Sequence, residues 1–512
     1  MANPLLIDVG VRNPRLRQLL GPAAVLLHPL YGLGLLILAS LPLLLVASQP
    51  AGVLLAALST YFLLMAVRLE QSWLTITPLP PLTILCLGAW LRCGLGGLLL
   101  ALGRPMRPEE SNSAFWQHLP AAQTLWVAMM AAAVAVFTYW PKSLPAKTTS
   151  SKWAGQFPLV NLTLACGAFA ISSISLGVLF GTLDRNPSSY LYWLAQRWQP
   201  DSLFIIFARF RDLFFVLAPL AIYKATRNWQ RLLIVTTLVA YPALALPLGG
   251  RGLLLYPILY TVIGTWLTPI STRILRLVIA ATLIFGLIAI PTVEVYRDTA
   301  EFTSLNRADL GKRIDLIVNA VQKFSNPSHF NRSFTRAGIS LYGCSDGYLF
   351  QEPAINRPRA GWHRMQALLR AWLPELLSPT TVPVRDGHII AEEIRGRSRT
   401  EAESMTYTSF PCVSFGADLY WRGGWRTVAI GSVIFAFAYR LVSQFWYSYA
   451  GWSSTWQILL LLYPATFLTM YPAGSIGETA WLWMWDLPKY VILISTICFI
   501  TGKLPRNPAP ES

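Results

Sequence analysis

Charged residues are scarce in this chain, and hydrophobic residues make up more than half of it. Asp, Glu, Lys and Arg together account for 13% of the 512 residues, against 54% for the hydrophobic types, and the mean hydropathy is +0.47. A soluble domain carries about 25% charged residues. The shortage of charge therefore excludes an ordinary soluble protein and predicts one that is embedded in a membrane.

Acidic residues are fewer than basic ones. The chain has 24 Asp and Glu against 41 Lys and Arg, which gives a formal net charge of +17. The basic residues are spread over all the polar segments, so we attribute them to membrane orientation and to contact with anionic headgroups. We expect no nucleic-acid partner. Histidines and cysteines show no clustered metal-ligand spacing, so we also expect no metal and no other cofactor.

Long apolar runs recur along the whole sequence. Runs of about 17 to 25 apolar residues are long enough to cross a bilayer as helices, and hydrocarbon requires every backbone amide to be satisfied within the protein. The sequence therefore predicts an all-α, polytopic integral membrane protein. We expect twelve spans, at residues 30–47, 52–67, 82–102, 121–141, 158–183, 202–223, 232–248, 253–270, 277–296, 424–444, 455–472 and 480–500.

The basic residues of the short loops predict the orientation. With the N-terminus inside, the inner segments hold fifteen Lys and Arg residues and the short outer loops hold five. Cytoplasmic loops retain positive charge, so both termini are predicted to be cytoplasmic. The domains that follow are nine spans in residues 1–296, an extracytoplasmic loop at 297–411, and three spans with a cytoplasmic tail in 412–512.

The outer loop, residues 297–411, is unusually long and basic, with thirteen arginines and two lysines. Two of its segments, 307–324 and 360–377, have apolar residues at helical spacing, which predicts amphipathic helices in the interface plane. Cys344 and Cys412 are the cysteines of this outer region, where a disulfide can form; two free thiols are the alternative. The loop's size and charge indicate a site for an anionic, membrane-anchored substrate.

Charged residues inside the predicted spans indicate a structural or functional role, because inserting an arginine near the middle of a membrane costs about 3 kcal/mol. Arg209, Arg211 and Asp212 lie about 10–15 Å below the outer surface at 1.5 Å per helical residue. Asp212 can neutralise only one of the two arginines. These arginines could bind a phosphate, or they could form a structural ion pair with Asp212; the sequence does not decide between the two roles. Arg92 has no partner pattern and is expected to be structural.

Two further motifs face the predicted outer side. Arg251 lies in the glycine-rich turn 248–253, where exposed backbone amides and a positive charge suit a phosphate. Asp418 and Arg422 are one helical turn apart in the segment 408–425 that re-enters the membrane. Asp418 is a general base or a brace for an arginine. We favour the brace, because nearby positive charge lowers the basicity of a carboxylate.

The order of these parts resembles the Wzy-type oligosaccharide repeat-unit polymerases, the O-antigen polymerases of bacterial cell surfaces. Members have ten to fourteen spans, a Gly-Arg-Gly type turn, a large periplasmic loop and a "Thr-Ser-x-Pro … Gly-Glu-x-Tyr … Gly" segment. This chain departs from the pattern with Asp418 in place of the usual glutamate and with the additional Arg422. It matches at Gly249–Gly252, 297–411, Thr408, Pro411, Gly416, Tyr420 and Gly424.

The resemblance implies a GT-C-like architecture in the bacterial inner membrane. It also implies transfer of a glycan from undecaprenyl diphosphate to another lipid-linked repeat unit. The expected partners are that lipid-linked glycan, the bilayer, a chain-length regulator and a flippase. Some members carry an arginine, ten residues and a glycine in the outer loop, a spacing that Arg332, Arg336 and Arg385 match here.

Arginine binds phosphate oxygens with a bidentate fork, so the leaving diphosphate suits the arginines named above. We therefore expect Arg209, Arg211, Arg251 and Arg422 to bind the diphosphate, and Arg332 and Arg336 to act with a general base. The acceptor hydroxyl needs that base, and His329 and Asp418 are the leading candidates. The remaining outer-side candidates are His363, His388 and Glu392.

Three alternatives remain. A ligase of the same broad fold would move a finished glycan to another acceptor. A lipid-linked oligosaccharide flippase or other transporter is disfavoured by the long outer loop and by the lack of visible inverted repeats. A membrane peptidase that uses Cys344 or Cys412 is disfavoured because neither cysteine lies in a nucleophile motif.

Overall fold

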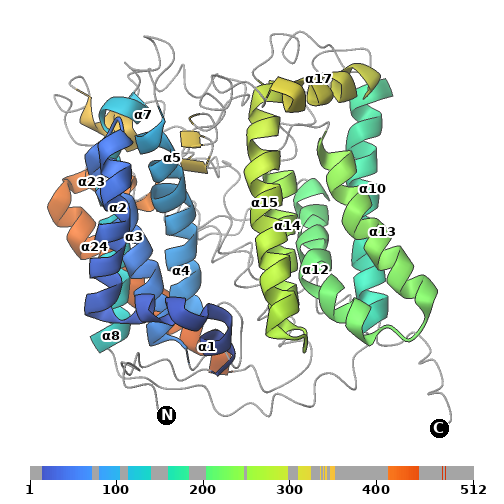
Figure 1. Cartoon of the computed structure of the whole chain (residues 1–512), viewed down its shortest axis with the longest axis horizontal. Coiled ribbons are helices and arrows are strands. Elements are labelled where there is room, and N and C mark those ends of the chain that lie inside the picture. The colour runs from blue at the N-terminus through green and yellow to red at the C-terminus, as the bar shows by residue number, and fades with distance from the viewer. Residues whose placement is uncertain are drawn as a thin grey trace, which may run out of the picture. The chain divides into compact units, whose positions relative to one another are not determined.

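The structure, a computed structural model, is helical throughout the part of the chain that it describes (Figure 1). This confirms the all-α class for that part. The described residues are 14–71, 80–103, 114–139, 159–183, 203–246, 251–297, 310–323 and 413–448, together with 335, 338–339, 341–342, 346–351, 476 and 479.

Helices occupy ten of the twelve predicted positions. Four of them are long and apolar enough to cross a membrane, at Pro29–Val46, Pro50–Leu69, Pro81–Leu102 and Leu119–Tyr139. These helices are expected of a membrane protein. The last two predicted spans, 455–472 and 480–500, lie outside the described residues, and the total of twelve stays a prediction.

The chain divides into two compact units. Unit 1 combines residues 1–144 with 324–445 and 466–485, and unit 2 combines 145–323 with 446–465 and 486–512. The predicted division at 296/297 and 411/412 separates the membrane spans from the extracytoplasmic loop, whereas the two units are defined by packing. The predicted division stays a prediction.

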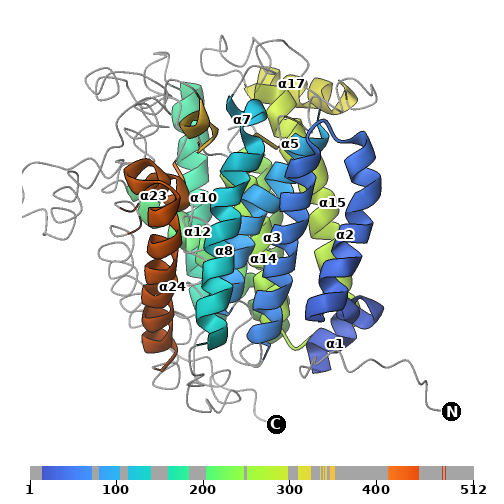
Figure 2. The same ribbon diagram turned by 90° about the vertical axis from the view of Figure 1, so that its left-hand side faces the viewer.

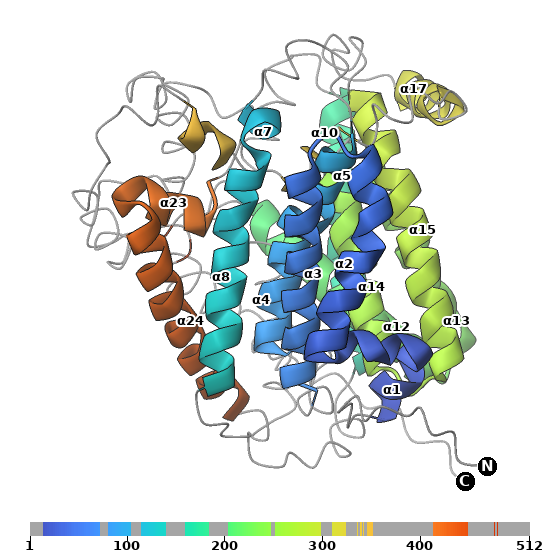
Figure 3. The same ribbon diagram turned by 60° about the vertical axis from the view of Figure 1, so that its left-hand side comes forward.

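Unit 1 is built around the helix α3. The elements of this unit are α1 (Pro14–Leu20), η1 (Gly21–Leu27), α2 (Pro29–Val46), α3 (Pro50–Leu69), α4 (Pro81–Ala89), the π-helical turn η3 (Trp90–Gly96), α5 (Gly97–Leu102), α7 (Ala114–Gln117), α8 (Leu119–Tyr139), η5 (Asp346–Phe350), α23 (Phe415–Gly423) and α24 (Trp425–Ser448). Helix α3 packs on α2, on the α4–η3–α5 span and on α8. In Figures 2 and 3, α8 lies between α3 and α24.

Gln123 of α8 donates a hydrogen bond to a backbone carbonyl of the π-helical turn η3. A π turn lengthens the helical hydrogen-bond pattern by one residue and is common at functional sites. The side-chain amide of Gln123 donates to the carbonyl of Cys93 at 2.8 Å and to that of Gly52 at 3.3 Å. Gly97 has no side chain, and its absence leaves the room that this buried amide occupies.

Glu70 caps the N-terminus of α4, at the end of unit 1 that the charge distribution predicts to be cytoplasmic. Its carboxylate accepts hydrogen bonds from the N–H groups of Leu82 at 3.0 Å and Thr83 at 2.7 Å, and from the Thr83 hydroxyl at 3.0 Å. These amides belong to the first turn of α4, whose N–H groups lack partners within the helix. Glu70 therefore caps α4 across a short separation in sequence.

Unit 2 packs α12 against α10, α13 and α14, and α14 against α15. Its elements are α10 (Leu159–Leu183), α12 (Leu203–Lys224), α13 (Asn228–Ala245), α14 (Arg251–Leu267), α15 (Thr272–Arg297) and α17 (Leu310–Lys323). Within this unit α17 runs across the end of α15 (Figure 1).

Helix α17 lies inside the predicted amphipathic segment 307–324, which confirms that helix. Ile317 is buried, whereas Ile314, Val318 and Val321 leave about half of their surface exposed. Such an apolar stripe is expected of a helix that lies in a membrane interface. The second predicted amphipathic helix, 360–377, lies outside the described residues.

Candidate functional site

The re-entry segment after the polar loop forms a short, well-defined helix, α23. Ser414 caps its N-terminus, because its Oγ accepts a hydrogen bond from the N–H of Ala417 at 3.1 Å. The helix ends at Gly423 and is capped by Gly424, whose positive φ of 72° is unfavourable for other residues and lets α24 begin at once. Gly416 lies against the backbone of Leu125 in α8, where a Cβ would come within 3.1 Å of the carbonyl oxygen. The motif glycines thus fix α23 in place.

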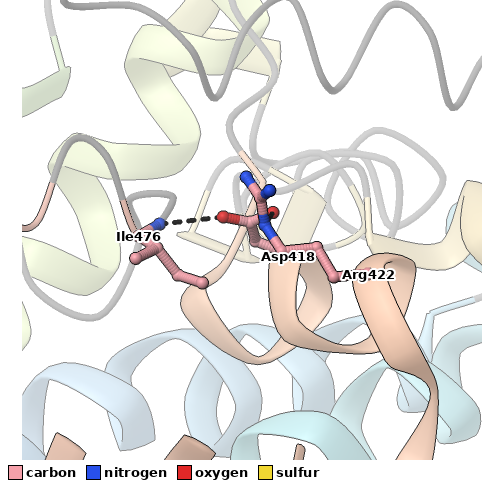
Figure 4. Close-up of polar contacts among 3 residues, drawn as sticks. All are labelled: Asp418, Arg422 and Ile476. Atoms are coloured by element: carbon pink, nitrogen blue, oxygen red, sulfur yellow. Dashed lines mark hydrogen bonds and ion pairs between the residues drawn. The ribbon is translucent and has the colours of Figure 1, made fainter. Parts of the chain in front are cut away.

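Asp418 and Arg422 form a buried ion pair on this helix (Figure 4). Arg422 Nε lies 2.9 Å from Asp418 Oδ1, and both side chains are 0% exposed. The other carboxylate oxygen, Oδ2, accepts a hydrogen bond from the backbone N–H of Ile476 at 2.9 Å. Both oxygens are therefore engaged, which is the bracing arrangement expected from the spacing.

Asp346, at the start of η5, is a buried carboxylate that the sequence reasoning missed. Trp126 of α8 donates its indole N–H to Oδ2 at 3.0 Å, and the backbone N–H of Ser414 donates to Oδ1 at 2.9 Å. Burial raises the pKa of Asp346 to about 6, although its hydrogen bonds with Ser414 and Trp126 and the charge of Arg92 oppose this rise. The side chain is the meeting point of the loop, α8 and the cap of α23.

Arg92 also reaches the loop, which the sequence reasoning did not anticipate. Its Nη1 donates to the backbone carbonyl of Tyr342 at 3.3 Å. The backbone of Tyr342 approaches Gly96 so closely that a Cβ there would lie 2.7 Å from the Tyr342 nitrogen. The Tyr342 ring meets Trp126 edge to face, with centroids 6.5 Å apart. This part of the loop therefore packs against the π-helical turn and α8.

An aromatic cluster joins η5 to the re-entry segment a second time. The Phe350 ring lies 5.0 Å from Tyr420 of α23 and 6.5 Å from Trp425 of α24, centroid to centroid. Tyr420 and Trp425 are 5.1 Å apart and edge to face. Trp425 is 45% exposed, so the cluster reaches the surface of unit 1.

Unit 2 contains a different buried pair, Arg211 with Asp212 of α12. Arg211 Nε and Nη2 lie 2.7 and 2.6 Å from Asp212 Oδ1. The guanidinium also makes a side-chain hydrogen bond with Tyr241 of α13. Asp212 thus pairs with Arg211. The side chains of Arg209 and Arg251 lie outside the described residues.

Several predicted site residues lie outside the described residues altogether. They are His329, Arg332, Arg336, Cys344, Cys412, His363, His388 and Glu392. Asp346 lies two residues after Cys344, and Ser414 lies two residues after Cys412. The N–H of Ser414 donates to Asp346, as given above. Within the described residues, no group of three or more His, Cys, Asp or Glu side chains is placed to hold a metal ion.

Comparisons with protein-family models, with curated proteins and with solved structures found no match to this chain. Within unit 1, the contacts place the braced Arg422, the buried carboxylate of Asp346 and the loop segment 346–350 next to one another.

Proposed function

We propose that the protein is a polymerase of lipid-linked oligosaccharide repeat units in the bacterial inner membrane, with both termini cytoplasmic. The observation that carries this proposal is the buried Arg422, which Asp418 holds in the segment directly after the basic loop. An arginine buried with a carboxylate brace is oriented as well as charged. This suits the binding of an anion that must be held in one geometry.

The proposed reaction is a glycosyl transfer. The non-reducing hydroxyl of one repeat unit attacks the anomeric carbon of a growing glycan, and its proton passes to a general base. The bond between that carbon and the diphosphate oxygen breaks, so the diphosphate leaves with the electron pair. Negative charge develops on the leaving group, and an arginine fixed beforehand stabilises it without reorganising during the reaction.

The contacts of Asp418 support a positioning role in this reaction rather than that of the base. A base must present an oxygen to the substrate hydroxyl, whereas both oxygens of Asp418 already accept hydrogen bonds, one from Arg422 and one from the backbone N–H of Ile476. The proposal therefore keeps His329 as the general base, with Arg332 and Arg336 as the arginines expected to act with it. A chain-length regulator and a flippase are the expected partners.

Lengthening by the purified protein tests the proposal. Given undecaprenyl-diphosphate repeat units, the wild type should produce a ladder of longer glycans without nucleotide sugar or ATP, because the diphosphate is itself the leaving group. Arg422→Ala should abolish the ladder, and Arg422→Lys should restore it only partly, since a point charge lacks the fork geometry. Arg426→Ala is the matched control, because Arg426 is exposed and only four residues away.

Each contrary outcome points elsewhere. Movement of the substrate across a vesicle with no change in its length would indicate a transporter. Transfer of the glycan to a different acceptor only would indicate a ligase. Full lengthening by Arg422→Ala would remove Arg422 from the site, and intact protein that leaves authentic substrate unchanged would end the polymerase proposal.

A further inference from the structure

Asp346 joins the polar loop to α8 and to the cap of α23, and its contacts require a carboxylate. It accepts from Trp126 at one oxygen and from Ser414 at the other, and it is 0% exposed. Two acceptors on opposite sides of one planar group are available in Asp but not in Asn, whose amide nitrogen is a donor. A buried ionisable group is costly, so its presence here needs a reason.

Ser414 connects Asp346 to the Asp418–Arg422 pair. Its N–H is bound by Asp346, its Oγ accepts from Ala417, and its carbonyl accepts from the N–H of Asp418 at 2.9 Å. The first turn of α23 is thus attached to the loop through one residue. Any shift of Ser414 moves the carboxylate that orients Arg422.

The second attachment of η5 strengthens this argument. The Phe350 ring packs on Tyr420, which lies on the same helix between Asp418 and Arg422. The element that begins at Asp346 therefore contacts α23 at its cap and again within the helix. The two attachments restrict both the translation and the rotation of α23.

We propose that Asp346 is a positioning residue for Arg422, acting through Ser414 and anchored by Trp126. The proposal rests on the function proposed above, in which Arg422 binds the leaving diphosphate. It assigns the buried end of the loop a role in the chemical step itself. A misplaced charge weakens the stabilisation of the transition state more than the binding of the substrate.

Three variants test the proposal: Asp346→Asn, Trp126→Phe and the double variant. Asp346→Asn turns an acceptor into a donor that faces the indole N–H, and Trp126→Phe removes that N–H but keeps an aromatic ring. Each should lower kcat for lengthening by about 10- to 100-fold per folded molecule and leave KM within about twofold. The double variant should be no worse than Asp346→Asn alone, because both remove the same contact.

Hydrogen exchange provides a readout that does not depend on activity. In the single variants, amides of α23 should exchange faster, while those of α8 away from Trp126 should keep their protection. The matched controls are Asp315→Asn on α17 and Trp229→Phe on α13, both exposed in the structure. Neither should change kcat or the exchange of α23.

The outcomes separate the two proposals. Wild-type kcat and wild-type protection of α23 in Trp126→Phe would overturn the positioning role. Equal loss of protection in α8 and α23 would also overturn it, because Asp346 would then serve only general stability. If the wild type never lengthens its substrate, the polymerase proposal fails, and faster exchange of α23 would still show that Asp346 positions this helix.

Discussion

The two units each bury an arginine with an aspartate, and they use the aspartate differently. In unit 2, one oxygen of Asp212 receives both Nε and Nη2 of the adjacent Arg211. In unit 1, Asp418 receives Nε of Arg422 at one oxygen and a backbone N–H at the other. Both arrangements neutralise a buried charge. In unit 1, the hydrogen bond from the N–H of Ile476 also ties the pair to the backbone and so fixes the direction of the charge, which is what a binding group needs.

The energetics of buried pairs offer a way to separate these roles. Removing one partner of a buried pair leaves a charge without compensation and costs about 3–5 kcal/mol, whereas replacing both by apolar residues is often neutral. Single and double replacements in the two units should therefore give different patterns of stability and activity.

The largest effect is expected for Asp418→Ala. It leaves Arg422 buried without its carboxylate and should lower the free energy of unfolding by about 3–5 kcal/mol. Asp212→Ala should cost a similar amount, and denaturant or thermal unfolding in detergent measures both. Asp418→Ala should also lose lengthening in the fraction that remains folded. An unchanged unfolding transition in either variant would contradict the burial of its pair.

Replacing each pair as a whole should have a smaller effect on stability and should separate the units by activity. Arg211→Met with Asp212→Leu should keep stability, because replacing a buried pair by apolar residues is often neutral, and lengthening by this variant would show that Arg211 serves the fold alone. Arg422→Met with Asp418→Leu should lose lengthening at a stability cost of about 1–3 kcal/mol, for the N–H of Ile476 left without its acceptor. Loss of lengthening in the unit 2 variant would instead place Arg211 in the diphosphate-binding group.

The smallest effect is a pH dependence carried by unit 1. Burial raises the pKa of Asp346 from 3.8 to about 6, so its protonated form is favoured on folding. The resulting stability is fully present below pH about 4 and is lost as the pH rises through 6. Asp346→Asn should flatten the thermal stability profile in this window.

Glu70→Gln is the comparison for that measurement. Burial raises the pKa of Glu70 from 4.5 to about 7, so its contribution is lost at a higher pH. Glu70→Gln should therefore flatten the profile chiefly between pH 6 and 7, where Asp346 has already titrated, and should leave the Asp346 contribution below pH 4.5 in place. Identical profiles for Asp346→Asn and the wild type would show that Asp346 titrates as an ordinary carboxyl.

The sequence reveals what local spacing encodes. Asp418 and Arg422 are four residues apart, so a helix brings them together whatever the rest of the fold does. The amphipathic period of α17 and the long apolar runs are visible for the same reason. These local features predict the helical class and the pairing of Asp418 with Arg422.

The sequence does not reveal contacts that depend on tertiary packing. Asp346 meets Trp126 across 220 residues and Ser414 across 68. Arg92 binds a backbone carbonyl, which no side-chain pattern marks. Asp346 is followed by glycine, a pair typical of surface turns, so its burial could not be inferred from its neighbours.

The separation of 220 residues between Trp126 and Asp346 also orders the biosynthesis of the protein. A ribosome adds about 5–20 residues per second, so α8 exists for roughly 10 to 45 seconds before its carboxylate partner is made. Throughout that time the indole N–H of Trp126 must donate to other acceptors, such as water or lipid headgroups. Unit 1 can therefore reach its final packing only after the polar loop has been synthesised, which makes the braced arginine one of the last features to mature in the new chain.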